Sequence, residues 1–114
     1  MEGLRVESKN GAIFFNFNGE ITLEVTADLK NEIEQALEGQ TYKVLVFDLA
    51  GVNFMDSSGI GFLVAQNTKV KGGGKRMYLY RPSAQVKKTL DLVQLSNFFQ
   101  IIEDEDALET VLPE

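Results

Sequence analysis

Hydrophobic and polar residues alternate with two different periods along this chain, and each change of period marks the start of another expected element. Apolar residues at every second position (Ile13, Phe15 and Phe17) predict a strand over residues 12–18 with one buried face. A shorter strand is expected over residues 4–8. The Asn10-Gly11 pair between the two predicts a tight turn, so these strands should form a β-hairpin.

The period becomes helical from residue 22 to residue 38. Val25, Leu29 and Ile33 fall on one stripe, which Ala36 and Leu37 extend, and Gly39 supplies a natural end to this helix. Residues 43–49 are apolar almost throughout, which is typical of a strand that is covered on both faces.

The remaining elements alternate in the same way. We expect a helix over residues 57–71 that ends at Gly72-Gly73-Gly74, followed by a strand over 76–80. The next helix should begin at Pro82-Ser83, with Val86, Leu90 and Val93 facing inward. A strand over 98–102 and a helix over 104–112 complete the chain. The order β-β-α-β-α-β-α-β-α predicts one α/β domain over residues 1–114. We expect a mixed β-sheet of four to five strands with about four helices, and binding sites where strand carboxyl ends meet helix amino ends.

Composition narrows the class of protein. The 114 residues suit one domain, and 44% hydrophobic with 25% charged residues is ordinary for a folded rather than a disordered chain. No apolar run approaches the roughly 20 residues that cross a bilayer, the first residues contain no apolar stretch of the secretory kind, and cysteine is absent. We therefore expect a cytoplasmic protein without membrane insertion.

The formal net charge of -6 disfavours nucleic-acid binding, because that function needs clustered lysine and arginine to displace counterions. An acidic chain more readily meets a partner protein with a positive surface.

The chain contains no histidine and no cysteine. A Ser-His-Asp triad, a cysteine nucleophile and the usual zinc sites are thereby excluded, and we expect no catalytic residues, no metal and no cofactor. The run Gly72-Gly73-Gly74-Lys75 superficially suggests a phosphate loop. It ends a helix and enters a strand, however, whereas a phosphate loop follows a strand and opens a helix.

The polar segment Asp56-Ser57-Ser58-Gly59 stands between two apolar runs and has two interpretations. Aspartate and serine are favoured helix N-caps, but one such residue suffices for a cap. Gly59 and Gly61 each cost up to ~1 kcal/mol inside a helix, which suggests that something approaches the backbone closely. A plain cap and a functional surface both remain open from the residues alone.

Two neighbouring side chains refine the second interpretation. As a nucleophile Ser57 lacks a base, since Lys69 lies about 18 Å further along the predicted helix. Phe62 falls nearly opposite the stripe of Ile60, Leu63 and Val64, so we expect it to be exposed. It is then either an ordinary exposed aromatic or an anchor for a partner.

Residues 44–61, Val-Leu-Val-Phe-Asp-Leu-Ala-Gly-Val-Asn-Phe-Met-Asp-Ser-Ser-Gly-Ile-Gly, closely resemble the signature of the STAS domain of bacterial anti-sigma factor antagonists. The likeness covers essentially the whole chain. It includes Gly19-Glu20-Ile21, the glycine-rich turn before Met77, and residues 86–95.

The resemblance implies a regulator of transcription that works by partner switching. In this family the serine after the aspartate, here Ser57, is phosphorylated by an anti-sigma factor that is also a serine protein kinase. The unmodified antagonist binds the anti-sigma factor and frees the sigma factor, and a serine phosphatase resets the phosphorylated form. The resemblance implies partner binding through the following residues: Thr22, Asp56, Ser57, Ser58, Gly59, Gly61 and Phe62.

One departure from the family pattern concerns Thr22, because well-studied antagonists carry an aspartate soon after Gly-Glu-Leu. The alternative implied by the resemblance is a STAS scaffold or transport-complex subunit, of the stressosome or lipid-transport type, that binds partners without phosphorylation. Either protein is expected to be a monomer or a weak dimer.

Overall fold

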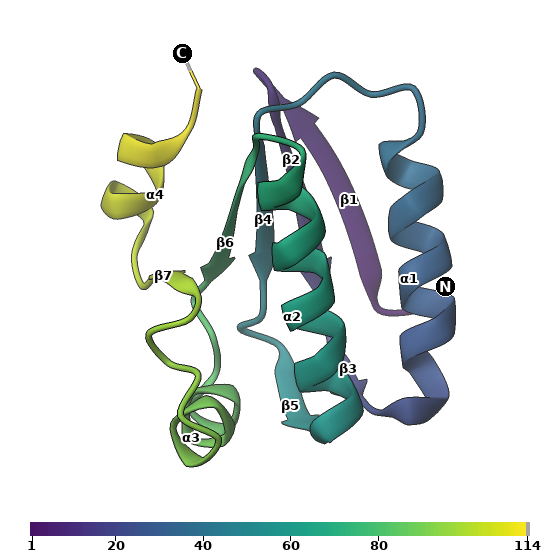
Figure 1. Ribbon diagram of the computed structural model, residues 1–114, viewed down its shortest axis with the longest axis vertical. Coiled ribbons are helices and arrows are strands. Elements are labelled where there is room, and N and C mark those ends of the chain that lie inside the picture. The colour runs from purple at the N-terminus through teal and green to yellow at the C-terminus, as the bar shows by residue number, and fades with distance from the viewer. Residues whose placement is uncertain (114) are drawn as a thin grey trace.

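A five-stranded mixed sheet forms the centre of the protein, seen here in a computed structural model that describes residues 1–113 (Figure 1). The elements follow the chain in this order: β1 (Leu4–Lys9), β2 (Ala12–Phe17), β3 (Gly19–Ile21), α1 (Leu23–Leu37), β4 (Val44–Asp48), β5 (Val52–Met55), α2 (Ser57–Gly72), β6 (Arg76–Tyr80), α3 (Ala84–Leu92), β7 (Gln100–Ile102) and α4 (Glu105–Val111). The strand order in the sheet is β1-β2-β4-β6-β7, with β1 antiparallel to β2 and the other neighbours parallel.

The hairpin at the start of the sheet confirms the expectation from the Asn10-Gly11 pair. Both residues have positive φ, 50° and 82°, which is the geometry of the tight turn that joins two antiparallel strands. Register places Phe15 of β2 beside Phe47 of β4, and their rings stack at 5.3 Å between centroids. Alternation in β2 therefore fixed which face carries the larger core, with Ile13, Phe15 and Phe17, whereas Ala12 and Phe14 on the other face join the smaller core, so the expectation of a single buried face was incomplete.

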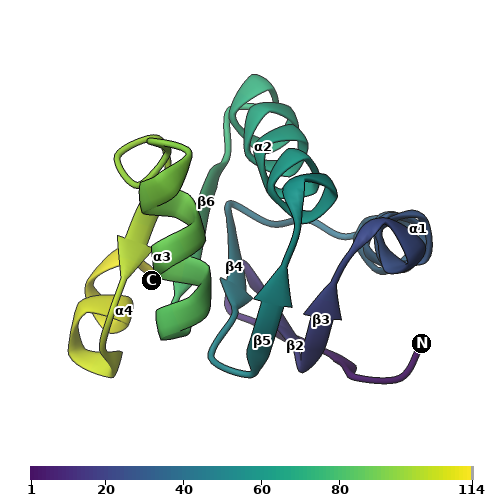
Figure 2. The ribbon, with the colours of Figure 1, turned by 90° about the horizontal axis from the view of Figure 1, so that it is seen from below.

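Both faces of the central strand β4 are covered, as its apolar run predicted. Leu45 and Phe47 belong to a large core that α1, α2 and α3 complete, whereas Val44 and Val46 belong to a smaller core under α4. Three helices therefore lie on one face of the sheet and the short α4 on the other (Figures 1 and 2).

A second, two-stranded parallel sheet of β3 and β5 was not anticipated. It lies at the lower end of the molecule in Figure 1, where β3 leads into α1 and β5 leads into α2. Strands of three and four residues carry too few positions to establish a period, so this part of the fold could not be recognised from the pattern.

Two smaller expectations were wrong. Val93 was expected to face the core but is 48% exposed, because α3 ends at Leu92 and Gln94 then takes a positive φ of 59° that turns the chain away. The last strand begins at Gln100 rather than at residue 98.

Among residues 1–113, no helix combines the length and apolar character needed to cross a membrane.

Candidate functional site

The amino termini of α1 and α2 lie together at the carboxyl end of the small sheet (Figure 2). They are brought there because β3 and β5 pair in parallel, with Ile21 opposite Met55, and each strand is followed by its helix after a single residue. Thr22 is the N-cap of α1 and Asp56 is the N-cap of α2. Segments more than 30 positions apart in the sequence thus form one surface.

The carboxylate of Asp56 binds both helix starts. Its Oδ1 accepts the Gly59 N–H at 3.1 Å, which is the expected cap of α2. Its Oδ2 accepts the N–H of Leu23, the first residue of α1, at 3.3 Å. The Asp56 main-chain N–H also donates to the Ile21 carbonyl at 3.3 Å. One side chain therefore fixes the spacing of the two helices.

The Ser57 side chain is left free by this arrangement. Ser57 is the exposed first residue of α2, and within residues 1–113 its hydroxyl forms no hydrogen bond, because Asp56 already caps the helix. Ser58 is half-buried and lines a groove between α1 and α2 together with Thr26, Lys30 and Phe62. Neither serine hydroxyl forms a hydrogen bond within residues 1–113, and Ser57 is the more exposed of the two.

The two glycines of the segment have different surroundings. A Cβ added at Gly59 would lie 2.6 Å from the Ile21 carbonyl oxygen and would also clash with the Met55 side chain. The close approach that the sequence suggested is therefore made at Gly59 by the protein's own strand β3. Gly61 is exposed, and a Cβ there would meet nothing within 4 Å.

The expectation that Phe62 is exposed was wrong. Its side chain is only 8% exposed and meets the Phe47 ring edge-to-face, with 6.3 Å between centroids. Phe62 and Ile60 form the two edges of a wide buried arc on α2, in which Gln66 lies next to Phe62 and Asn67 next to Ile60. A buried glutamine and the neighbouring buried Asn67 hid the width of this arc, because the sequence pattern assigned polar residues to the surface.

Carboxylates dominate the charge near the exposed serine. Glu24, in the first turn of α1, accepts a hydrogen bond from the Thr22 hydroxyl at 2.8 Å. This bond, together with one from the Glu24 backbone N–H, lowers the pKa of Glu24, against the weaker opposing effects of desolvation and of the Asp56 charge. Thr22 therefore does not cap α1 through its side chain but orients a carboxylate beside the site.

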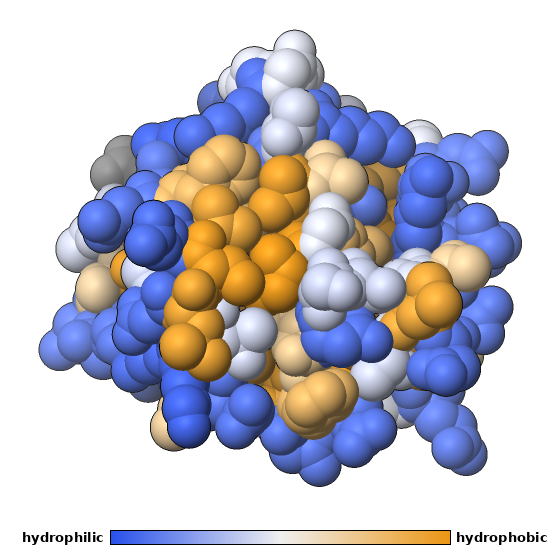
Figure 3. Space-filling view, turned by 60° about the horizontal axis from the view of Figure 1, so that its bottom comes forward, coloured by the Kyte–Doolittle hydropathy of each residue, from blue (hydrophilic) through white to orange (hydrophobic). Residues whose placement is uncertain are grey.

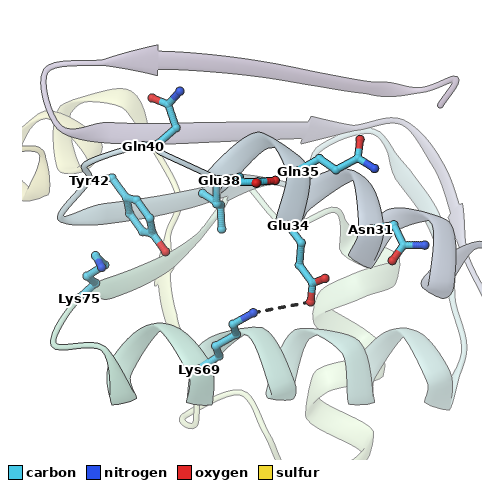
Figure 4. Close-up of a pocket in the computed structure, with 9 residues that line it drawn as sticks. Asn31, Glu34, Gln35, Glu38, Gln40, Tyr42, Lys69 and Lys75 are labelled. Carbon is cyan, nitrogen blue, oxygen red and sulfur yellow. Dashed lines mark ion pairs between the residues drawn. The ribbon is translucent and has the colours of Figure 1, made fainter.

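A larger hollow of about 700 Å³ lies at the other end of the same two helices (Figure 4). Lys69 forms an ion pair with Glu34 across it at 3.6 Å, and the Lys75 ammonium stands over the Tyr42 ring at 4.7 Å from the centroid. It is a wide, open groove of mixed polar and apolar lining, in which Lys69, Glu34 and Lys75 already have partners. In the described part of the chain, no group of three or more acidic side chains could hold a metal ion.

Replacing Asp56 with alanine should remove both helix caps at once. We expect a loss of about 1–2 kcal/mol in the free energy of unfolding, because a single cap is worth ~1 kcal/mol and the Leu23 N–H would also lose its partner. Chemical denaturation of Asp56→Ala and of the control Asp56→Asn, which keeps one acceptor oxygen, measures this. Equal stability of Asp56→Ala and the wild type would contradict the double cap.

Comparison with known proteins adds a family and several relatives. A family model described as the STAS domain matches residues 4–108. An anti-sigma F factor antagonist from Lysinibacillus sphaericus is 25% identical over 93 residues, which cover 82% of this chain and 80% of the relative.

Solved structures with the same fold include an anti-sigma factor antagonist from Mycobacterium paratuberculosis. It is 25% identical, with a TM-score of 0.81 and coverage of 95% of this chain and 92% of that one. The antagonist SpoIIAA in its unphosphorylated form is 20% identical, with a TM-score of 0.77 and 95% of both chains covered. SpoIIAA of Bacillus is also known in a phosphorylated form, with a TM-score of 0.70, 19% identity and coverage of 95% and 98%.

Proposed function

Because this chain belongs to the STAS domain family, we propose that it is an anti-sigma factor antagonist that binds its partner through the surface around Ser57. In this proposal the unmodified protein binds an anti-sigma factor that is also a serine protein kinase, and a sigma factor is released. Phosphorylation of Ser57 ends the binding, and a serine phosphatase restores it. The names of the relatives support the class of function.

The proposal rests on the observation that Asp56, and not Ser57, makes the hydrogen bonds that hold the two helix starts. Asp56 caps α2 and holds α1, and the exposed Ser57 hydroxyl at the helix start has no hydrogen-bond partner among residues 1–113. A serine with no structural duty at an exposed turn is accessible to a modifying enzyme. In this role the chain is a substrate of the kinase and needs no catalytic residues of its own.

The modification itself is a phosphoryl transfer. The Ser57 Oγ bonds to the γ-phosphorus of ATP while the bond from that phosphorus to the bridging oxygen of ADP breaks. The hydroxyl proton passes to a base of the kinase. The phosphatase removes the group by hydrolysis: a water oxygen bonds to the phosphorus, the bond from phosphorus to Ser57 Oγ breaks, the hydroxyl is restored and inorganic phosphate is released.

The fold should tolerate the phosphate even though the interface should not. At the first turn of α2 a charge of about -1.5 to -2 is favoured by free N–H groups and by the helix dipole. A partner that covers Ser57 must instead strip water from this dianion beside the carboxylates of Asp56 and Glu24. Phosphorylation would therefore act on binding and leave folding largely unchanged.

Phosphorylation of Ser57 can be tested with the purified protein, a cognate anti-sigma serine kinase and ATP. We expect mass spectrometry to find one phosphoryl group on Ser57, none on the Ser57→Ala variant, and normal modification of the control Ser58→Ala. Phosphate on Ser58 would contradict the assignment. No phosphate at all, with the partner still bound, would favour a STAS scaffold that works without phosphorylation.

A further inference from the structure

We propose that Leu23 and Phe54 are the apolar anchors of the partner interface, and that the partner receives them in apolar hollows edged by lysine or arginine. This proposal rests on the proposed function and specifies the chemistry of the anti-sigma factor surface that covers Ser57. The arguments are the exposure of the two side chains, their fixed positions on either side of Asp56, and the charges that accompany them.

Leu23 is the more exposed anchor. Its side chain is 69% exposed although it is a large apolar residue at the start of α1. Its main-chain N–H is bound by Asp56 Oδ2 at 3.3 Å, so the backbone that carries the side chain is held in place. An apolar side chain on a fixed backbone loses little conformational freedom on binding, which is the property of a good interface anchor.

Phe54 occupies the corresponding place on β5. It is 42% exposed and precedes Asp56 by two residues. The strand register explains why the Phe54 side chain faces outward. In the next pair along the small sheet, the side chains of Ile21 and Met55 face inward and are only 1% and 2% exposed. Alternation then directs Phe54 and its neighbour Glu20 away from the core. Aromatic side chains in such positions are enriched among residues that dominate binding energy.

Asp56 places the two anchors around Ser57. It is the residue before Ser57 in the chain, it binds the Leu23 N–H, and it follows Phe54 on the same short stretch of backbone. A partner that covers Ser57 therefore meets Leu23 on one helix start and Phe54 at the end of the strand that leads to the other.

Acidic side chains accompany each anchor. Glu20 pairs with Phe54 across the small sheet, Glu24 follows Leu23 on α1, and the Asp56 carboxylate accepts the Leu23 N–H. The lysine that lines the adjoining groove, Lys30, stands further along α1. With a net charge of -6 for the whole chain, complementarity requires a partner surface rich in lysine or arginine around its apolar hollows.

Apolar side chains also gather elsewhere on the lower end of the molecule, as the orange areas of Figure 3 show. Leu92, Val93 and Phe98 are exposed at the end of α3 and in the loop that follows it. Within residues 1–113 none of the three forms a hydrogen bond with Asp56 or Ser57, whereas Leu23 is bound by Asp56 directly, so they serve as controls for the proposed anchors.

The test measures the dissociation constant of the complex between this protein and the anti-sigma serine kinase that phosphorylates Ser57 in the assay above. We expect Leu23→Gln and Phe54→Thr each to weaken binding by about 10- to 100-fold, the range that loss of a buried large apolar side chain produces. The matched controls are Leu92→Gln, at a side chain that is 74% exposed, and Val6→Thr on β1, at one that is 44% exposed. Both should bind like the wild type, and all four variants should keep the wild-type circular dichroism spectrum.

The charges are tested separately. Glu20→Gln and Glu24→Gln should slow association and flatten its dependence on salt, because opposite charges steer the encounter at low ionic strength. Wild-type affinity in both Leu23→Gln and Phe54→Thr, or a loss confined to Leu92→Gln, would overturn this proposal while the proposed function stands. A wild-type protein that is neither phosphorylated nor bound by the kinase would overturn both.

Discussion

The variant Ser57→Glu is expected to bind the anti-sigma factor roughly 30-fold to several thousand-fold more weakly than the wild type, with almost no change in melting temperature. A buried charge without a partner costs about 2–5 kcal/mol at an interface, which corresponds to this range of affinities. The same carboxylate in the free protein is exposed at the first turn of α2, where the helix dipole favours negative charge.

Isothermal titration calorimetry and a thermal melt of the same preparation separate these two effects. Thr68→Glu is a suitable control, since it adds the same charge at an exposed position of α2 about three turns from Ser57. Binding should survive in the control. If Ser57→Glu instead unfolds the domain, Ser57 is chiefly a structural residue and the switch at this position is wrong.

The substitution Gly59→Ala should destabilise the fold by about 1–3 kcal/mol, the usual cost of overpacking a closely packed site. The added methyl group would lie 2.6 Å from the Ile21 carbonyl oxygen, so α2 and β3 must move apart. For a domain of this size each kcal/mol lowers the melting temperature by roughly 4–8 °C.

Gly61→Ala is the matched control, two residues further along the same helix. Its methyl group meets nothing within 4 Å, and alanine is favoured over glycine in a helix by up to ~1 kcal/mol, so this variant should be as stable as the wild type or slightly more stable. Denaturant unfolding of the two variants gives the comparison. Equal stability of the two variants would show that Gly59 is not held by close packing.

The parts of the fold that were predictable are those in which one local pattern decides the outcome. The alternation of Ile13, Phe15 and Phe17 fixed which face of β2 carries the larger core, and the continuous apolar run fixed β4 as a central strand. The small sheet depends on pairing between Gly19–Ile21 and Val52–Met55, and neither segment is long enough to reveal itself alone.

In the candidate site too, the local interactions were predictable and the long-range ones were not. The capping role of Asp56 was predictable because it concerns a backbone N–H three residues away, at Gly59. Its second bond, to Leu23, spans 33 positions and leaves no trace in local sequence. Phe62 was misplaced because the helix buries Gln66 as well as apolar residues, which widens the buried face beyond the apolar stripe.

The bond between Asp56 and Leu23 has a consequence for how related proteins diverge. Asp56 accepts the main-chain N–H of residue 23 and makes no demand on its side chain, so every amino acid except proline can occupy this position with the same hydrogen bond. The geometry around Ser57 can therefore stay constant while the side chain at position 23 varies. Duplicated copies of such a gene could acquire different partners by substitutions at this one position, without rebuilding the turn that is modified.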